Sequence, residues 1–175
     1  YMREEETVMY PSSILIIEGI HGLNPALTPE LDPSLCFKIY ISALTSMIID
    51  DHNRISTTDN RMLRRLVRDN RTRAIPTEDT LSMWPSVERG EKNHIFPYQN
   101  NADVMINSAM PYELSALAPQ AMNLLRSVKP ESGYAFATAR RLLKFLELIC
   151  TIPATEIPAD SITREFLGGS IYESV

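Results

Sequence analysis

The chain has 175 residues, a formal net charge of −5 and 44% hydrophobic residues, a composition that suits one globular domain with a buried core. Its apolar runs are shorter than the roughly 18–20 residues needed to span a bilayer, which argues against a membrane protein. The acidic balance argues against a nucleic-acid-binding protein, in which positive charge usually covers a whole face. Cys36 and Cys150 stand alone, so neither a disulfide framework nor a structural zinc site is expected, and a cytoplasmic protein is favoured.

The first predicted element is a strand at residues 14–17. Four aliphatic residues follow one another there without alternation, which is typical of a strand buried on both faces of a parallel sheet. Glu18 follows at the carboxyl end, where ligands bind in open α/β sheets, so Glu18 is a candidate ligand for magnesium or water. The alternative is a glutamate that stabilises a turn or caps a helix. A second strand is predicted at 37–41, and the polar run 50–53 is interpreted as a turn rather than a metal site.

Residues 59–73, DNRMLRRLVRDNRTR, are predicted to form a helix with two distinct faces. At about 100° per residue, the arginines and the apolar residues fall on opposite arcs. Ser56 is a candidate N-cap, and its spacing to Asp59 approximates a capping box. The arginine arc holds Arg61, Arg64, Arg65, Arg68 and Arg71, and the apolar arc holds Met62, Leu63, Leu66 and Val67.

We interpret the arginine arc as an anion-binding surface. Six arginines and no lysine lie between positions 61 and 73, and a guanidinium group binds phosphate at two points, which lysine does not. Asp69 is the only acid in this stretch that lies four positions from an arginine, whereas a surface helix held by salt bridges would alternate its charges. The alternative is a solvated helix face whose back packs on the core.

The following segments contain one more strand and further helices. A helix is predicted from Thr77, as its N-cap, through Trp84. The polar residues 86–99 have the character of a mobile lid. A short buried strand is predicted at 103–106, and mostly helical structure is predicted at 111–128.

The C-terminal part is predicted to be helical. An amphipathic helix covers residues 133–149, capped by Ser132, and a shorter helix at 161–167 is ended by Gly168. We expect the apolar stripe of the longer helix to be exposed in this chain and to drive self-association. The stripe consists of Phe136, Ala139, Leu142, Leu143 and Leu146. The order of all these elements predicts an α/β layered domain with a parallel sheet.

Three of these stretches resemble one known family when they are taken together. Arg64-Arg65-x-x-Arg68-Asp69-x-x-x-Arg73 reproduces most of the lid pattern R-R-x-x-R-D-x-x-x-R-G-R, residues 16–20 match a strand ending in E-G-I, and residues 102–106 match A-D-V-I-I. The pattern resembles the uridine kinase and phosphoribulokinase family of P-loop kinases, in the family's order, over roughly residues 14–125. The stretches IIEGIHGLNP, DDHNRISTTD, GEKN-IFPYQ and REF-GGS are similar to larger bacterial uridine-kinase-like proteins.

The resemblance implies a partial P-loop kinase fold: α/β, three-layered, with a short parallel sheet, an arginine-bearing lid helix and C-terminal helices. It divides the chain into the C-terminal half of the kinase core at 11–128, with a lid at about 59–100, and a helical extension and tail at 129–175. It implies transfer of the ATP γ-phosphate to a hydroxyl of a uridine-like nucleoside, with ATP and Mg²⁺ as cofactors.

The resemblance also assigns roles to individual residues. Glu18 would help to hold the magnesium ion. Arg64, Arg68 and Arg73 would bind the ATP phosphates, with Arg68 and Arg73 also acting in catalysis, and Arg65 would face the phosphate acceptor. Arginine and magnesium suit this chemistry because phosphoryl transfer depends mostly on positioning and charge stabilisation.

Two departures from the family pattern shape the expectation of activity. Ala74 and Ile75 stand where the family has Gly-Arg, so one phosphate or acceptor contact is absent. No G-x-x-x-x-G-K-[S/T] phosphate loop occurs in these 175 residues. We therefore expect the back half of a longer kinase, inactive by itself. Two alternatives remain: a non-catalytic module that binds anions or nucleotides for regulation, and an RNA-binding domain in which Trp84, Phe96 and Tyr98 stack on bases.

Overall fold

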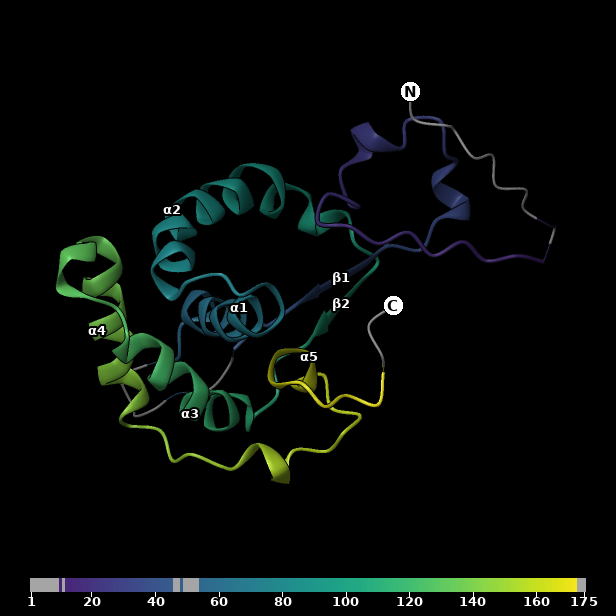
Figure 1. The fold of residues 1–175 in the computed structure, drawn as a ribbon. Helices are drawn as coiled ribbons and strands as arrows, with labels where there is room; N and C mark the ends of the chain where they lie inside the picture. Colours follow the sequence, from purple (N-terminus) through teal and green to yellow (C-terminus); the bar gives the residue numbers. More distant parts are fainter. Residues whose placement is uncertain (1–9, 11, 46–47, 49–53, 173–175) are drawn as a thin grey trace.

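The computed structural model describes residues 10, 12–45, 48 and 54–172. Two short strands, β1 (Ile39–Ser42) and β2 (Val104–Asn107), pair in parallel with Ile39 opposite Val104. The helices are α1 (Thr57–Arg73), α2 (Thr77–His94), α3 (Glu113–Arg126), α4 (Tyr134–Leu146) and α5 (Arg164–Leu167). Short 3-10 helices are η1 (Pro25–Leu27), η2 (Pro33–Leu35), η3 (Phe96–Asn101), η4 (Pro130–Ser132) and η5 (Ala154–Glu156). The predicted α/β class with a short parallel sheet is confirmed (Figure 1).

The arginine-rich helix α1 forms as predicted. Ser56 is its N-cap, and the Ser56 hydroxyl accepts a hydrogen bond from the backbone N–H of Asp59 at 3.3 Å. The apolar arc is buried, which confirms the predicted core face: Met62, Leu63, Leu66 and Val67 are each at most 2% exposed. Burying four such side chains stabilises the helix far more than its intrinsic propensity does.

Helix α2 is longer than predicted. It begins one residue earlier than expected, with Pro76 rather than Thr77 as its N-cap, continues through Pro85 and ends at His94. The segment 86–99 is therefore helical, with α2 up to residue 94 followed by η3, and its role as a mobile lid stays a prediction. Proline removes one backbone donor from the helix interior, but side chains on both sides of Pro85 pack on the core and compensate. Trp84 is buried there, and Val87 packs against the same cluster.

Helices α3 and α4 complete the core with α1 and α2. The central side chains include Leu63, Leu81, Leu117 and Leu142, all fully buried. Helix α3 runs through Pro119. One cluster thus joins residues from Ile55 to Leu167.

The apolar stripe of α4 is buried rather than exposed. Ala139, Leu142, Leu143 and Leu146 lie in the core, and Phe136 packs against it half-buried. The expectation that this stripe is exposed is wrong, because α2 and α3 already cover it, and the self-association predicted from its exposure loses that basis. The cap was also misplaced: Gly133, at a positive φ of 52°, precedes the helix, and Ser132 belongs to η4.

The predicted strand at 14–17 does not form. These residues are extended without strand pairing, and their side chains are exposed, with Ile14 at 89% and Ile16 at 86%. An aliphatic run becomes a buried parallel strand only where strands pair beside it and helices cover both faces. Within the described residues only β1 and β2 form a sheet, and Figure 1 shows the 14–20 segment lying beyond their amino ends, away from the helices.

Within the described ranges, the two strands are not covered by helices on both faces, as the predicted layered domain would require. The second predicted strand, 37–41, is observed as β1, but Phe37 precedes it and is exposed. β2 matches the predicted third strand but is exposed along its length rather than buried. The helices pack mainly on one another, so the described residues do not sandwich the two strands between helical layers.

Two predictions concern other parts of the chain. The polar turn predicted at 50–53 lies outside the described residues. The short C-terminal helix forms as α5, and Gly168 ends it at a φ of 87°. Across the segments that the structure describes, every helix is too short or too polar to cross a bilayer.

Candidate functional site

The arginines of α1 do not form a uniform free row. They divide into three groups by the partners that they contact, either on α1 itself or on other helices. Arg61 and Arg64 turn toward carboxylates on α2 and α3. Arg65, Arg68 and Arg73 gather around Asp69. Arg71 contacts α5.

Arg64 is the most enclosed of these arginines. It is 8% exposed, and its guanidinium forms a two-point ion pair with the carboxylate of Glu113, which is 1% exposed. It also donates to the Ser108 hydroxyl at 3.1 Å and to the Ser108 carbonyl at 2.6 Å. The ring of Phe166 lies 4.8 Å from its central carbon. Arg64 therefore joins α1 to α3 and α5, and the ATP contact predicted for it would require exchange of these partners.

Arg65, Arg68 and Arg73 share one carboxylate. Asp69 is 1% exposed, and its two oxygens accept from Arg65 Nε at 3.1 Å, Arg68 Nε at 3.2 Å and Arg73 Nη1 at 3.2 Å. The three arginine side chains remain accessible, at 28%, 31% and 57%. We call this group the Asp69 cluster. Three of the four arginines predicted to contact substrate or ATP thus meet at the Asp69 carboxylate.

The Asp69 cluster carries excess positive charge. Asp69 contributes one negative charge against three guanidinium groups. The only other carboxylate that meets the cluster in the described residues is Glu165, 3.6 Å from Arg68 Nη1. One positive charge is left uncompensated, and the arginine side chains that carry it reach solvent. Such a group attracts anions, and guanidinium geometry favours phosphate or carboxylate.

The end of α1 shapes the cluster through Asp69 and Ala74. Ala74 adopts the left-handed conformation, with φ 51° and ψ 30°, at the position where glycine is preferred. The N–H of Ile75 donates to the Asp69 carbonyl at 3.2 Å. The helix thus ends on the same residue whose side chain gathers the arginines. Ala74 keeps the turn that glycine would make, at a conformational cost of roughly 1–2 kcal/mol.

Glu18 is not brought to the Asp69 cluster. It is exposed in the segment that follows residues 14–17, and Figure 1 shows this segment apart from α1. No group of three or more His, Cys, Asp or Glu side chains that could hold a metal occurs in the described part of the chain. Glu18 offers one solvent-exposed carboxylate. Such a carboxylate fits Mg²⁺ only in company with phosphate oxygens and water.

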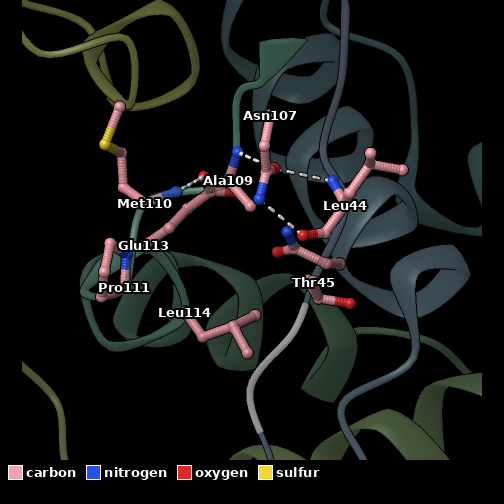
Figure 2. Close-up of a pocket in the computed structure, with 9 residues that line it drawn as sticks. Leu44, Thr45, Asn107, Ala109, Met110, Pro111, Glu113 and Leu114 are labelled. Carbon is pink, nitrogen blue, oxygen red and sulfur yellow. Dashed lines mark hydrogen bonds between the residues drawn. The ribbon is translucent and has the colours of Figure 1, made fainter. Parts of the chain in front are cut away.

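A small cavity lies where the strands end. It has a volume of about 50 Å³, is partly open, and is lined by residues from the loop after β1, the end of β2 and the segment leading into α3, including Leu44, Asn107 and Met110 (Figure 2). The Asn107 side chain ties the two loops, accepting from Leu44 N–H at 2.9 Å and donating to its carbonyl at 2.8 Å. Asn60 of α1 also lines it, and its buried Oδ1 has no partner. This volume admits water but not a nucleobase.

Two histidines meet near the N-terminal segment. The rings of His21 and His94 stand edge to face with centroids 6.4 Å apart, beside an open hollow lined also by Asn24 and Leu27.

The RNA-binding alternative loses Trp84 as a stacking partner for bases. Trp84 is 2% exposed, and its indole N–H donates to Glu88 at 2.9 Å, so it cannot stack on a base.

Sequence reasoning missed the acids that pair with the arginine arc from elsewhere. Arg61 pairs with Glu91, 30 positions away, and Arg64 pairs with Glu113, 49 positions away. Spacing along one helix reveals only partners three or four positions apart. No local signal could have revealed these two pairs.

One comparison with known proteins finds a match. The family model described as phosphoribulokinase / uridine kinase family matches residues 2–115, well over half of the chain. No curated protein and no solved structure matches. The matched region contains both strands, α1, α2 and the beginning of α3. Helices α4 and α5 lie beyond it.

Proposed function

Because this chain belongs to the phosphoribulokinase / uridine kinase family, we propose that it carries the phosphate-binding arginines of an ATP-dependent kinase. The substrate class proposed is a nucleoside-like molecule with a free hydroxyl. The proposal rests on one observation: Arg65, Arg68 and Arg73 converge on Asp69 with more positive charge than their carboxylates neutralise. This cluster lies inside the matched region.

The proposed binding event is an exchange of partners. A phosphate oxygen takes the place of an Asp69 oxygen on Arg68 or Arg73, and the exposed guanidinium groups reach it by side-chain rotation. Asp69 remains hydrogen-bonded to the other arginines, so its buried charge is never left alone. Leaving it alone would be expensive, because an unpaired buried carboxylate costs several kcal/mol.

The proposed roles follow from the chemistry of phosphoryl transfer. When bound, ATP would supply the phosphoryl group and Mg²⁺ would draw charge from the phosphate oxygens. Arg68 and Arg73 bind phosphate oxygens and stabilise the negative charge that develops on them. Arg65, on the neighbouring turn of α1, faces the acceptor. Glu18 would supply one carboxylate toward a magnesium ion on these phosphates only if its segment, which lies apart from α1 (Figure 1), approached the Asp69 cluster.

Arg64 is given a different role from the one that the resemblance implied. Its donors are engaged by Glu113 and Ser108, so we propose that it positions α1 rather than binds ATP. In this role Arg64 fixes the rotation of the helix. Arg65 and Arg68 then point away from α3 and toward solvent.

A second candidate function is anion or nucleotide binding without catalysis. One observation favours it: the 175 residues contain no glycine-rich phosphate loop ending in Lys-Ser or Lys-Thr. Without that loop, the backbone donors that cradle the phosphates of ATP are missing from these residues. We therefore propose that the 175-residue protein binds phosphate-bearing ligands and does not turn them over.

Calorimetric titration of the purified protein with MgATP tests the proposal. Arg68→Gln and Arg73→Gln should each weaken binding about tenfold or more, because each removes a charge-assisted hydrogen bond to phosphate worth about 1.5–3 kcal/mol. The matched control is Arg140→Gln, an exposed arginine on α4, which should change affinity less than twofold. Equal affinity for all the variants would refute the assigned site. Phosphorylation of uridine by the 175-residue protein would refute the assignment as a non-catalytic portion.

A further inference from the structure

We propose that α5 is an internal competitor for the phosphate-binding arginines: the Glu165 carboxylate occupies Arg68, and an anion must displace it. This inference rests on the proposed function of the Asp69 cluster and concerns its regulation. Helix α5 lies beside α1 (Figure 1) and follows the family-matched region by some fifty residues. The contact is therefore a feature of this chain that the family match does not cover.

The contact between α5 and α1 involves two arginines of the same helix. Arg68 Nη1 lies 3.6 Å from Glu165 Oε1. One turn further along, Arg71 donates from Nη2 to the Glu165 carbonyl at 2.7 Å and from Nε to the Phe166 carbonyl at 3.0 Å. Arg71 thus holds two successive backbone carbonyls of α5, those of Glu165 and Phe166. These hydrogen bonds fix the backbone position from which the Glu165 side chain extends toward Arg68.

The backbone of α5 is anchored independently of Glu165. Phe166 and Leu167 are at most 8% exposed and belong to the core, and Phe166 lies under Arg64. Thr163, just before the helix, is fully buried. The helix therefore stays docked when the Glu165 side chain swings away. Displacement needs a side-chain rotation rather than unfolding of the C-terminal segment.

Glycine at position 168 allows the close approach. Gly168 has a φ of 87°, and a Cβ atom built there would lie 3.3 Å from Arg71 Nη1. A larger residue would push the Arg71 guanidinium away from the last carbonyls of α5. The position of Glu165 over Arg68 therefore depends on this turn.

The Glu165 pair has the properties of a reversible competitor. The Glu165 side chain is 56% exposed and that of Arg68 is 31% exposed. Exposed ion pairs are weak and screened by salt, so a polyanion that reaches several arginines of the Asp69 cluster displaces Glu165, whereas a weak single-charge anion competes poorly. This makes the cluster selective for ligands with several negative charges.

The test is calorimetric titration of the 175-residue protein with inorganic tripolyphosphate. Glu165→Gln removes the competing charge and keeps the side-chain size, and we expect it to tighten binding about two- to fivefold, the range set by exposed ion pairs. Glu156→Gln is the matched control: it makes the same charge change at an exposed glutamate of η5 and should alter affinity far less. In an Arg68→Gln background, Glu165→Gln should have no further effect.

The outcomes separate this inference from the proposed function. If the wild type binds tripolyphosphate and Glu165→Gln binds it equally well, α5 is not a competitor, while the proposed binding site stands. If the gain persists in the Arg68→Gln background, or Glu156→Gln reproduces it, the effect is general electrostatics and the inference is overturned. If no variant binds, the proposed function fails and the inference falls with it. Melting curves of each variant establish that it is folded.

Discussion

Replacing Glu113 with glutamine tests the role of the buried ion pair in holding α1. Glu113→Gln keeps nearly the same volume but removes the charge that balances Arg64. The guanidinium retains the Ser108 carbonyl and hydroxyl as acceptors, at 2.6 and 3.1 Å. The guanidinium loses the carboxylate that accepts from it at two points. The N–H₂ group of the new glutamine side chain instead places a hydrogen-bond donor opposite a donor of Arg64. We expect α1 and α3 to lose their strongest polar connection.

The expected magnitude follows from burial. Arg64 is 8% and Glu113 1% exposed, and removal of one partner from a buried pair costs about 3–5 kcal/mol. The Asp59–Arg141 pair serves as an exposed comparison for the buried pair. It is also a two-point ion pair, but the Arg141 side chain is 55% exposed. Exposed pairs contribute about 0.2–1 kcal/mol, so Arg141→Gln should cost several-fold less than Glu113→Gln.

Urea unfolding followed by tryptophan fluorescence measures both losses. Trp84 is the only tryptophan and is 2% exposed, so its emission reports loss of the core. The double variant Arg64→Met/Glu113→Leu, which replaces the pair with apolar side chains, should recover most of the stability. A loss of less than about 1 kcal/mol for Glu113→Gln, within the range of exposed pairs, would refute the reasoning.

Three further predictions concern the turn after α5, acid stability and the exposed apolar segment. Gly168→Ala should destabilise the fold by about 1–3 kcal/mol because its φ is 87°. Gly90→Ala, in α2 with open space around it, should instead stabilise it by about 0.5–1 kcal/mol; equal effects in thermal melts would contradict this. The backbone N–H of Lys129 lowers the pKa of Glu78 below its usual 4.5, so its contribution is present above that pH and is lost as pH falls through the folded-state pKa. Glu78→Gln should flatten the acid limb of the stability profile, and an unchanged limb would count against this linkage. Ile14→Ser with Ile16→Ser should reduce binding of a hydrophobic dye without lowering the melting temperature, because both side chains are exposed; unchanged dye binding would show that the exposed apolar surface lies elsewhere.

Helix α1 was predictable because its signals are local. An N-cap serine, an apolar arc and a dense arginine arc all lie within eighteen residues, and each is read from spacing alone. The burial of Leu63 and Leu66 followed directly from that periodicity. The convergence of Arg65 and Arg73 on Asp69 was not predicted, although both lie four positions from it, because that spacing was interpreted as too little pairing for a salt-bridged face.

Features that depend on distant parts of the chain could not be predicted in this way. Residues 14–17 have the composition of a buried strand, but burial requires neighbouring strands and helices, which the run itself does not encode. The polar character of residues 86–99 suggested a mobile lid and did not indicate a helix. Contacts of Trp84, Val87 and Glu91 with the core and α1 make it a helix instead.

The partners of the arginine arc show the same limitation within the site. Glu113 comes from α3, and the carbonyls that accept from Arg71 belong to α5, more than ninety positions along the chain. A helical wheel assigns five of the six arginines to one face, yet folding gives them different partners. Arg64 pairs with the buried Glu113, Arg71 donates to carbonyls of α5, and the arginines around Asp69 keep accessible side chains.

The most direct test of the central claim is an NMR titration that follows the arginine Nε–Hε resonances as tripolyphosphate is added. We predict that the resonances of Arg65, Arg68 and Arg73 shift together and saturate with one binding curve, while that of Arg140 on α4 stays in place. Uniform small shifts of all arginines, or saturation confined to arginines outside the Asp69 cluster, would contradict the claim that this cluster binds phosphate.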